Sequence, residues 1–273
     1  MARLKWDQVG ERYYETGTKQ GVLYLKTEAG YGAGIAWNGL TGFSESPDGA
    51  DTTDLYADDI KYLSIRAKEN FKGTITAYTY PEEFEQCDGS ASPIKGMKIG
   101  QQVRKPFGFV YRTAIGNDVD YDDHGYKIHI VYGATASPSS KDFKTINDSP
   151  EAIEFSWEID TVPVEVGKIG DVTYKPTATI ELDSTRLSEE KMTAIEDILY
   201  GTDGTDSYTA FSGSAFETGV TYYERSGSTG NYVYTPTADS SKETGKTYYT
   251  KSTSGGNAAR LPLPAEIYSI LAA

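Results

Sequence analysis

The sequence predicts a mainly β protein of the α+β kind: an antiparallel sandwich or barrel with one flanking amphipathic helix and a small inserted β module. Three observations predict this class. Tyrosine and glycine are abundant, at 22 and 28 of 273 residues; several segments alternate apolar and polar residues; and one late segment has helical spacing. Tyrosine favours pleated, half-buried surfaces and glycine favours turns, so the composition argues against a helical bundle. The length allows one substantial core and one small accessory domain.

Alternating segments that end at turn residues mark the expected strands. The clearest is 72–80, which stops at Pro81. Segments 107–115 and 126–132 flank an acidic, glycine-bearing stretch, so we expect a hairpin with a long loop over 116–125. The other expected strands are 21–26, 152–160 and 177–183, with a turn-rich stretch at 28–34.

One helix is expected after the last of these strands. Ser188 can cap it, and Glu189 and Glu190 lie in its first turn, where the helix dipole favours acids. Apolar residues then fall on one helical face: Met192, Ile195, Ile198 and Leu199. Gly201 occupies the C′ position that often ends a helix. We expect this helix to cover one face of the sheet.

Residues 204–257 differ from the rest, because they are almost wholly Gly, Ser, Thr, Tyr and charged residues. Within them Glu-Thr-Gly-Val-Thr-Tyr-Tyr at 217–223 matches Glu-Thr-Gly-Lys-Thr-Tyr-Tyr at 243–249, a period of 26. Two copies are too few for a solenoid, so we expect a small β module of two similar hairpins. The apolar segment 261–271 predicts that the chain then returns to the main body. The predicted domains are a core of residues 1–203, completed by 258–273, and an insertion at 204–257.

The formal net charge is −14, from 40 acidic and 26 basic residues. So acidic a surface repels phosphate backbones, which argues against a protein that grips nucleic acid but allows one that DNA slides past. Solubility alone is the simpler interpretation. The single cysteine, Cys87, excludes an intrachain disulfide and a cysteine-based zinc site. The polar N-terminal segment is unlike a signal peptide and no apolar run could span a membrane, so we expect synthesis in a reducing cytoplasm.

The residues that could carry chemistry form no recognised catalytic or metal-binding pattern. His124 and His129 lack the spacing of a zinc-protease helix, and alternation puts His129 on the polar face of a strand. The acidic run 118–125 resembles a calcium loop only at its start, so a solvated turn is the simpler interpretation. Cys87 lacks cationic neighbours, and the glycosylation-like Asn-Asp-Ser at 147–149 has no sign of secretion beside it. We therefore expect no enzymatic activity, no cofactor and no metal.

Several segments in order carry a resemblance. They include Trp-Asp-Gln-Val-Gly-Glu-Arg-Tyr-Tyr at 6–14, Gly-Ile-Ala-Trp-Asn-Gly-Leu at 34–40, Tyr-Ala-Asp-Asp-Ile-Lys-Tyr at 56–62, and the stretches 15–17, 19–24, 77–89, 101–108, 111–113, 115–118, 125–132, 147–151 and 261–264. Together they resemble the major tail protein (tail tube protein) family of siphophages that infect Gram-positive bacteria. The resemblance covers residues 1–200 and resumes near 260, and the insertion is the variable part.

The resemblance implies a structural virion protein without enzymatic activity. Its β-sandwich subunits would close into rings, expected to be hexameric, whose inner sheets join into a continuous β-barrel. Rings would stack through loops and the N-terminal arm into a non-contractile tail tube, through which the tape measure protein and double-stranded DNA pass. The implied partners are further copies of the chain, the tape measure protein, the tail terminator and the distal tail protein, with no membrane and no specific DNA binding. The protein would be made in the host cytoplasm and reside in the virion tail.

Two features of the sequence gain a role from this resemblance. Residues 38–60, with proline, glycine and acids, would form a long loop that bridges subunits or rings and becomes ordered on assembly. The acidic balance would give a lumen to which neither DNA nor the tape measure protein adheres.

Two other classes of function are weighed against the structural one. A carbohydrate- or cell-surface-binding module would use Tyr222, Tyr223, Tyr248 and Tyr249 as stacking platforms, although alternating tyrosines more often pack a hairpin. Such a site would belong to the insertion, on the outer surface of a tube. A cell-wall hydrolase is disfavoured, because the sequence offers no paired general acid and base.

Overall fold

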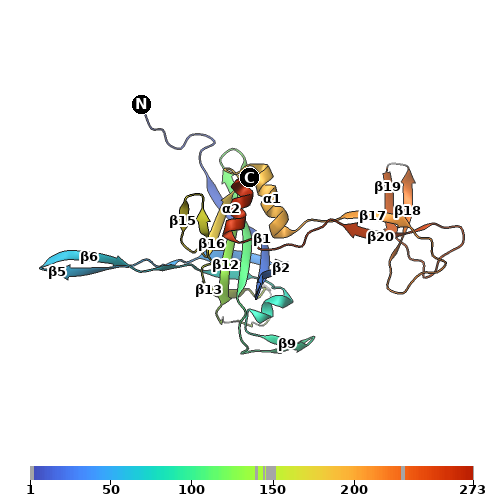
Figure 1. The fold of residues 1–273 in the computed structure, drawn as a ribbon, viewed down its shortest axis with the longest axis horizontal. Coiled ribbons are helices and arrows are strands. Elements are labelled where there is room, and N and C mark those ends of the chain that lie inside the picture. The colour runs from blue at the N-terminus through green and yellow to red at the C-terminus, as the bar shows by residue number, and fades with distance from the viewer. Residues whose placement is uncertain (1–2, 139–140, 144, 146–151, 229–230, 273) are drawn as a thin grey trace. The chain divides into compact units, whose positions relative to one another are not determined.

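The computed structural model describes residues 3–138, 141–143, 145, 152–228 and 231–272. It divides into two compact units (Figure 1). The first unit is Met1–Tyr200 with Ala259–Ala273, and the second is Gly201–Ala258. Antiparallel sheets dominate both units, so the predicted mainly β fold is confirmed. No helix within the described ranges is long and apolar enough to cross a membrane.

The elements follow one another along the chain with short connections. The strands of the first unit are β1 (Tyr14–Thr27), β2 (Gly30–Trp37), β3 (Leu40–Glu45), β4 (Asp48–Gly49), β5 (Thr52–Ala57), β6 (Ile60–Arg66), β7 (Glu69–Asn70), β8 (Lys72–Ala77), β9 (Ala91–Ile94), β10 (Met97–Ile99), β11 (Phe107–Asn117), β12 (Tyr121–Ala136), β13 (Phe155–Thr161), β14 (Gly167–Ile169), β15 (Val172–Tyr174) and β16 (Thr179–Asp183). Its helices are the 3-10 turn Glu82–Gln86, α1 (Glu189–Tyr200) and α2 (Pro264–Ala272). The second unit contains β17 (Thr205–Ala210), β18 (Tyr222–Ser228), β19 (Asn231–Pro236) and β20 (Tyr248–Ser254).

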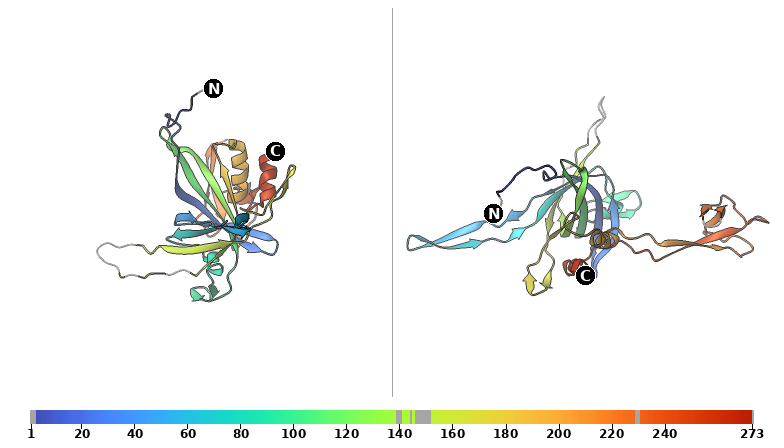
Figure 2. Two further views of the ribbon diagram at one scale, coloured as in Figure 1. Left: turned by 90° about the vertical axis from the view of Figure 1, so that its left-hand side faces the viewer. Right: turned by 90° about the horizontal axis from the view of Figure 1, so that it is seen from above.

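An eight-stranded antiparallel sheet forms the body of the first unit, in the order β2-β1-β11-β12-β13-β8-β3, with β16 paired to β12. The long strand β12 serves two parts of this sheet. Its residues 127–131 pair with β16, and its last residues, 134–136, pair with β13. Within the described residues the sheet curls but stays open rather than closing into a barrel (Figure 2).

Two hydrophobic clusters hold this sheet in its curved form. One lies inside the curl and is rich in aromatic rings, with Trp37 packed on Phe84 at 4.6 Å and on Trp157 at 5.7 Å between ring centroids. The other lies between the opposite face of the sheet and the two helices, which lie side by side (Figure 2). Buried aliphatic and aromatic side chains of this size dominate the stability of a core.

Helix α1 confirms the sequence pattern that predicts it. The carbonyl of Ser188 accepts the N–H of Met192 at 3.0 Å, and Gly201 ends the helix with φ of +80°. Met192, Ile195 and Leu199 are buried against the sheet. Helix α2 is an addition to the expectation, because the sequence pattern identified 261–271 only as an apolar segment.

The predicted long loop between β11 and β12 is wrong, because the turn there is tight. The side-chain oxygen of Asn117 accepts the backbone N–H of Val119 at 2.9 Å and of Asp120 at 2.5 Å. This Asx turn lets Asn117 pair with Tyr121, so most of the acidic run belongs to strand β12. The turn-rich stretch 28–34 likewise becomes the start of β2.

The predicted loop over 38–60 is also wrong, because strands β3, β4 and β5 occupy most of it. Strand β5 pairs with β6 in a hairpin whose turn residues, Asp58 and Asp59, both have positive φ, at 51° and 63°. Two successive left-handed residues are what a tight two-residue hairpin turn requires, and aspartate tolerates that conformation better than most residues.

The second unit is a four-stranded sheet in the order β17-β20-β18-β19. Its two sequence repeats occupy equivalent places, and equivalent tyrosines meet at the centre. The rings of Tyr208 and Tyr234 stack at 3.9 Å with 1° between their planes. Tyr223 packs edge-on to Tyr208 at 5.3 Å, and Tyr249 packs edge-on to Tyr234 at 5.1 Å. The duplicated sequence therefore forms a module with approximate two-fold symmetry.

The repeated Glu-Thr-Gly-x-Thr-Tyr-Tyr motif also forms the same local structure twice. The hydroxyl of Tyr222 accepts the backbone N–H of Glu217 at 3.0 Å, and that of Tyr248 accepts the N–H of Glu243 at 3.4 Å. Tyr222 and Tyr248 are buried, at 3% and 0% exposed. These two rings are therefore core residues of the module.

Candidate functional site: a polar face between two open strand edges

Strands β1, β11, β12 and β16 form the part of the sheet whose two faces differ in chemistry. Because alternate residues of a strand point to opposite faces, the registers assign each side chain to a face. On one face the opposed residues are apolar and packed under α1 and α2: Val110, Ile130 and Ile180. On the other face the opposed residues are mostly polar: Tyr111, His129 and Glu181 in one row, and Thr113, Lys127 and Asp183 in the next.

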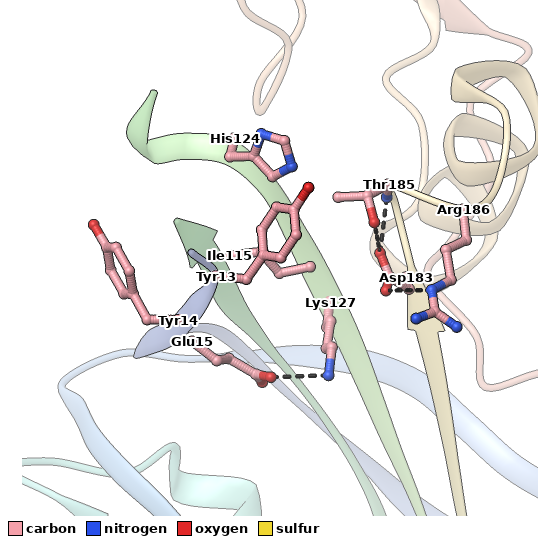
Figure 3. Close-up of a pocket in the computed structure, with 9 residues that line it drawn as sticks. All are labelled: Tyr13, Tyr14, Glu15, Ile115, His124, Lys127, Asp183, Thr185 and Arg186. Carbon is pink, nitrogen blue, oxygen red and sulfur yellow. Dashed lines mark hydrogen bonds and ion pairs between the residues drawn. The ribbon is translucent and has the colours of Figure 1, made fainter. Parts of the chain in front are cut away.

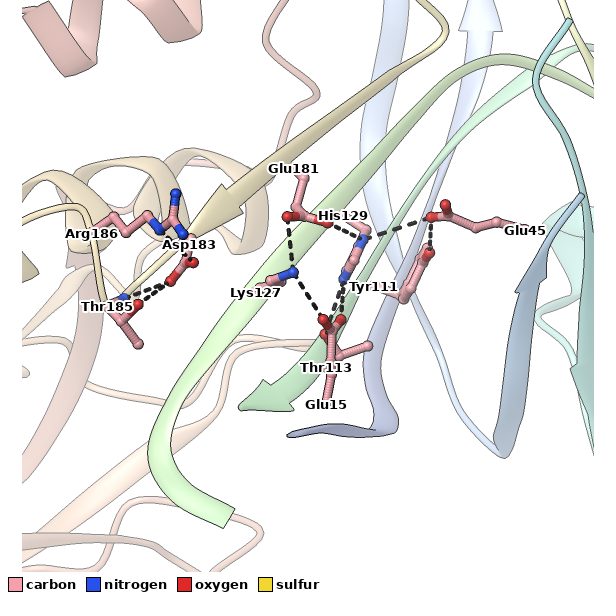
Figure 4. Close-up of polar contacts among 10 residues, drawn as sticks. All are labelled: Glu15, Glu45, Tyr111, Thr113, Lys127, His129, Glu181, Asp183, Thr185 and Arg186. Atoms are coloured by element: carbon pink, nitrogen blue, oxygen red, sulfur yellow. Dashed lines mark hydrogen bonds and ion pairs between the residues drawn. The ribbon is translucent and has the colours of Figure 1, made fainter. Parts of the chain in front are cut away.

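Glu15 of β1 connects the strands of this polar face (Figure 4). Its carboxylate accepts hydrogen bonds from the Thr113 hydroxyl at 2.6 Å and from Lys127 Nζ at 2.9 Å. Lys127 Nζ also lies 3.0 Å from Glu181 Oε1. Partial burial opposes ionisation of Glu15, but the bonds from Thr113 and Lys127 outweigh it, so its pKa lies below the ordinary value. The bond to Glu15 in turn raises the pKa of Lys127, so both groups are charged at neutral pH.

His129 lies on the polar face, as alternation predicts, but it is enclosed there with only 6% of its surface exposed. Its ring stacks on Tyr111 at 4.6 Å, with 3° between the planes. The Thr113 hydroxyl donates its one hydrogen to Glu15, so it accepts from His129 Nε2 at 2.9 Å. The Tyr111 hydroxyl donates to Glu45 at 2.8 Å, and burial followed by this bond raises the pKa of Tyr111.

A groove of about 790 Å³ crosses the polar face from β1 to the end of β16 (Figure 3). Its lining residues are Tyr13, Tyr14, Glu15, Ile115, His124, Lys127, Asp183, Thr185 and Arg186. At the β16 end Asp183 accepts the Thr185 N–H at 2.8 Å and hydroxyl at 2.6 Å, and lies 3.5 Å from Arg186 Nε. Carboxylates thus stand at both sides of the groove, with Lys127 between them.

The two sides of this four-stranded region are open strand edges. Residues 14–20 of β1 pair with β11 on one side, and β2 joins the other side of β1 only from Gly21 onward. Strand β16 pairs with β12 alone. Across the part of the chain that the structure describes, no other strand pairs with either edge. Successive strands are antiparallel, so β1 and β16 run in opposite directions.

The other candidate residues of the sequence lie elsewhere or have other roles. His124 Nδ1 lies 3.0 Å from Asp120 at one end of the groove. Cys87 is buried in the aromatic cluster, and burial raises the pKa of its thiol to about 12. The Asn-Asp-Ser at 147–149 lies outside the described residues. Among the residues that are described, no group of three His, Cys, Asp or Glu is arranged to hold a metal ion.

Glu15, Thr113 and Glu181 are the members of this face that sequence patterns did not identify. Alternation in 126–132 correctly separated Lys127 and His129 from the apolar residues between them. Glu15 carries no comparable signal, because its partners are 98 residues away at Thr113 and farther still at Lys127. Only the register of four strands brings these residues together.

The chain matches no protein-family model, and no curated protein matches it in sequence. Six chains of solved structures match it. One belongs to the cryo-EM structure of the anti-feeding prophage baseplate, 6-fold symmetrised. The identity is 9%, the TM-score is 0.31, and the match covers 66% of this chain and 97% of that chain. A likeness this low does not bear on function.

Proposed function

We propose that this protein is a structural subunit of a phage tail, and that its copies form stacked rings of the non-contractile tail tube. The tape measure protein and DNA would pass through the channel, and the subunit itself would catalyse no reaction. Six copies to a ring is the number that the sequence resemblance implies. Further copies of the chain would be its main partners, with the tail terminator and distal tail protein at the ends of the tube.

The observation that carries the proposal is the pair of open edges on one curved sheet. Strand edges present unpaired N–H and C=O groups, which pair readily with another strand. Because β1 and β16 run in opposite directions, β1 of a rotated copy meets β16 as an antiparallel partner. This contact joins two different surfaces, so it repeats from copy to copy and closes into a ring when the rotation permits.

The faces of the sheet fit the inside and outside of such a ring. Helices α1 and α2 cover the apolar face, so the polar face is the one left to line a channel. Glu15, Glu181 and Asp183 are acidic there, against Lys127 and Arg186. A lining with excess carboxylate gives phosphate groups no cations to bind, so DNA would move past it without adhering.

Cross-linking between the two edges tests the proposal directly. One preparation carries Thr16→Cys on β1 and another carries Glu181→Cys on β16. On mixing with a short bismaleimide, we expect covalent dimers that contain one of each, in large excess over Thr16→Cys homodimers. Val172→Cys, on the exposed strand β15, replaces Glu181→Cys as the matched control and should give few products. Homodimers through one edge, or no edge-dependent product, would contradict a head-to-tail ring.

Carbohydrate binding by the second unit has less support. Tyr222 and Tyr248 are buried, and Tyr249 is 7% exposed, so these rings are not free to stack on a sugar. Deleting residues 204–257 separates the two functions, because Thr202 and Asn257 are bridged and a short linker can join the ends. We expect the deleted protein to assemble as the full chain does. Loss of assembly would show that the second unit takes part in it.

A further inference from the structure

The hairpin of β5 and β6 exposes one apolar face. The two strands form a sheet of their own, with no third strand among the described residues (Figure 1). Asp54 accepts from Ser64 at 2.5 Å and from Lys61 at 2.8 Å on one side of the hairpin. The apolar residues of the register stand on the other side, at 42–66% exposed: Leu55, Ile60, Leu63 and Ile65. A two-stranded hairpin is marginally stable alone in water, so this face favours a partner that covers it.

The N-terminal segment is a second unpartnered element of the same chain. Residues 3–6 alternate basic and apolar side chains, and Leu4 and Trp6 are both 73% exposed. The chain is first held at Gly10, whose N–H donates to Asp118 Oδ1 at 2.9 Å. In an extended conformation Leu4 and Trp6 would share one side and the two basic residues the other. The segment therefore has the pattern of a strand that lacks a sheet.

The charges of the two elements are complementary. The arm carries Arg3 and Lys5, whereas the hairpin turn carries Asp58 and Asp59. Within the described part of the chain, none of these four residues forms an ion pair or hydrogen bond through its side chain. An added strand with Leu4 and Trp6 on the apolar side would extend the apolar face of the hairpin and bring basic groups to an acidic turn.

We propose that residues 3–6 of one copy dock on the β5–β6 hairpin of a second copy. The partner is a second copy because every copy supplies both halves, and both halves stay exposed within the single chain. One arm and one hairpin per copy make a contact that links each subunit to the next in one direction. The inference rests on the proposed tube, in which it joins neighbouring subunits independently of the β1 and β16 edges.

Mixing two full-length variants tests this contact. Leu4→Asp with Trp6→Asp disables the arm, and Leu63→Asp with Ile65→Asp disables the hairpin face. All four side chains are exposed, so both variants should fold. We expect each variant alone to lose the association that depends on this contact. Mixed together they retain one intact arm and one intact hairpin, and in sedimentation velocity should form complexes of about twice the mass of either alone.

Charge reversal and a matched control complete the test. Arg3→Glu with Lys5→Glu should weaken association, and Asp58→Lys with Asp59→Lys in the other copy should restore it. Val172→Asp with Tyr174→Asp, on another exposed hairpin, should change nothing. Variants that associate like the original protein, or a mixture that sediments as its separate parts, would overturn the inference. The cross-link between β1 and β16 would be unaffected by that outcome, so the ring proposal is judged separately.

Discussion

Two buried tyrosines attach the helical layer to the sheet, and removing their hydroxyls should destabilise the first unit measurably. The Tyr24 hydroxyl donates to the carbonyl of Leu199, in the last turn of α1, where carbonyls lack a helical partner. The Tyr132 hydroxyl donates to the carbonyl of Pro262, just before α2, at 2.9 Å. Both tyrosines are fully buried. Each Tyr→Phe change leaves a buried carbonyl without its donor, at a cost of about 1–2 kcal/mol in the free energy of unfolding.

For a unit of this size the expected loss corresponds to a decrease in Tm of about 2–8 °C. Urea unfolding followed by tryptophan fluorescence reports on the first unit alone, because all three tryptophans belong to it. Tyr268→Phe, at an exposed position of α2, is the control and should cost less than about 0.5 kcal/mol. If Tyr24→Phe or Tyr132→Phe unfolds at the same urea concentration as the control, the assigned hydrogen bond does not stabilise the fold.

Three further perturbations follow from the contacts. Glu15 has a pKa below its ordinary value of 4.5, so its contribution is full above that pH and lost as the pH falls through the lowered pKa. Because the carboxylate is 36% exposed, Glu15→Gln should cost only about 0.5–1 kcal/mol at pH 7, and the difference should disappear in urea titrations at the acid end; a difference that grows on acidification would contradict the assigned bonds. Cys87 is buried and burial raises its pKa to about 12, so a thiol reagent at pH 8 should label it only after unfolding, as mass spectrometry can check; rapid labelling of the folded protein would place the thiol at the surface. Tyr208→Ala and Tyr234→Ala should destabilise the second unit equally, and a double-mutant cycle should give a coupling of about 0.5–1.5 kcal/mol, because the two rings stack; unequal costs without coupling would argue against the two-fold arrangement.

Local patterns in the sequence predicted the elements whose burial is decided by near neighbours. Strand β8 alternates buried and half-buried residues along its whole length, as an alternating segment should. Helix α1 has its buried residues on the expected stripe. Helix α2 could have been found as well, since Pro264 stands at its first position, where proline is favoured.

The hairpin β5–β6 escaped the sequence reading for a physical reason. Its apolar residues alternate, but Asp58 and Asp59 replace the asparagine–glycine pair that usually marks a tight turn. The polar face escaped for a different reason, because Glu15 meets Lys127 and Glu181 only through three strand registers. No pattern within one segment contains that information.

Electron microscopy of the concentrated, purified protein measures most directly whether the open edges find partners in further copies. Negative staining should show hollow rods of uniform diameter, with a stain-filled channel along their axis. Dispersed single subunits at every concentration, or filaments without a channel, would contradict assembly through β1 and β16.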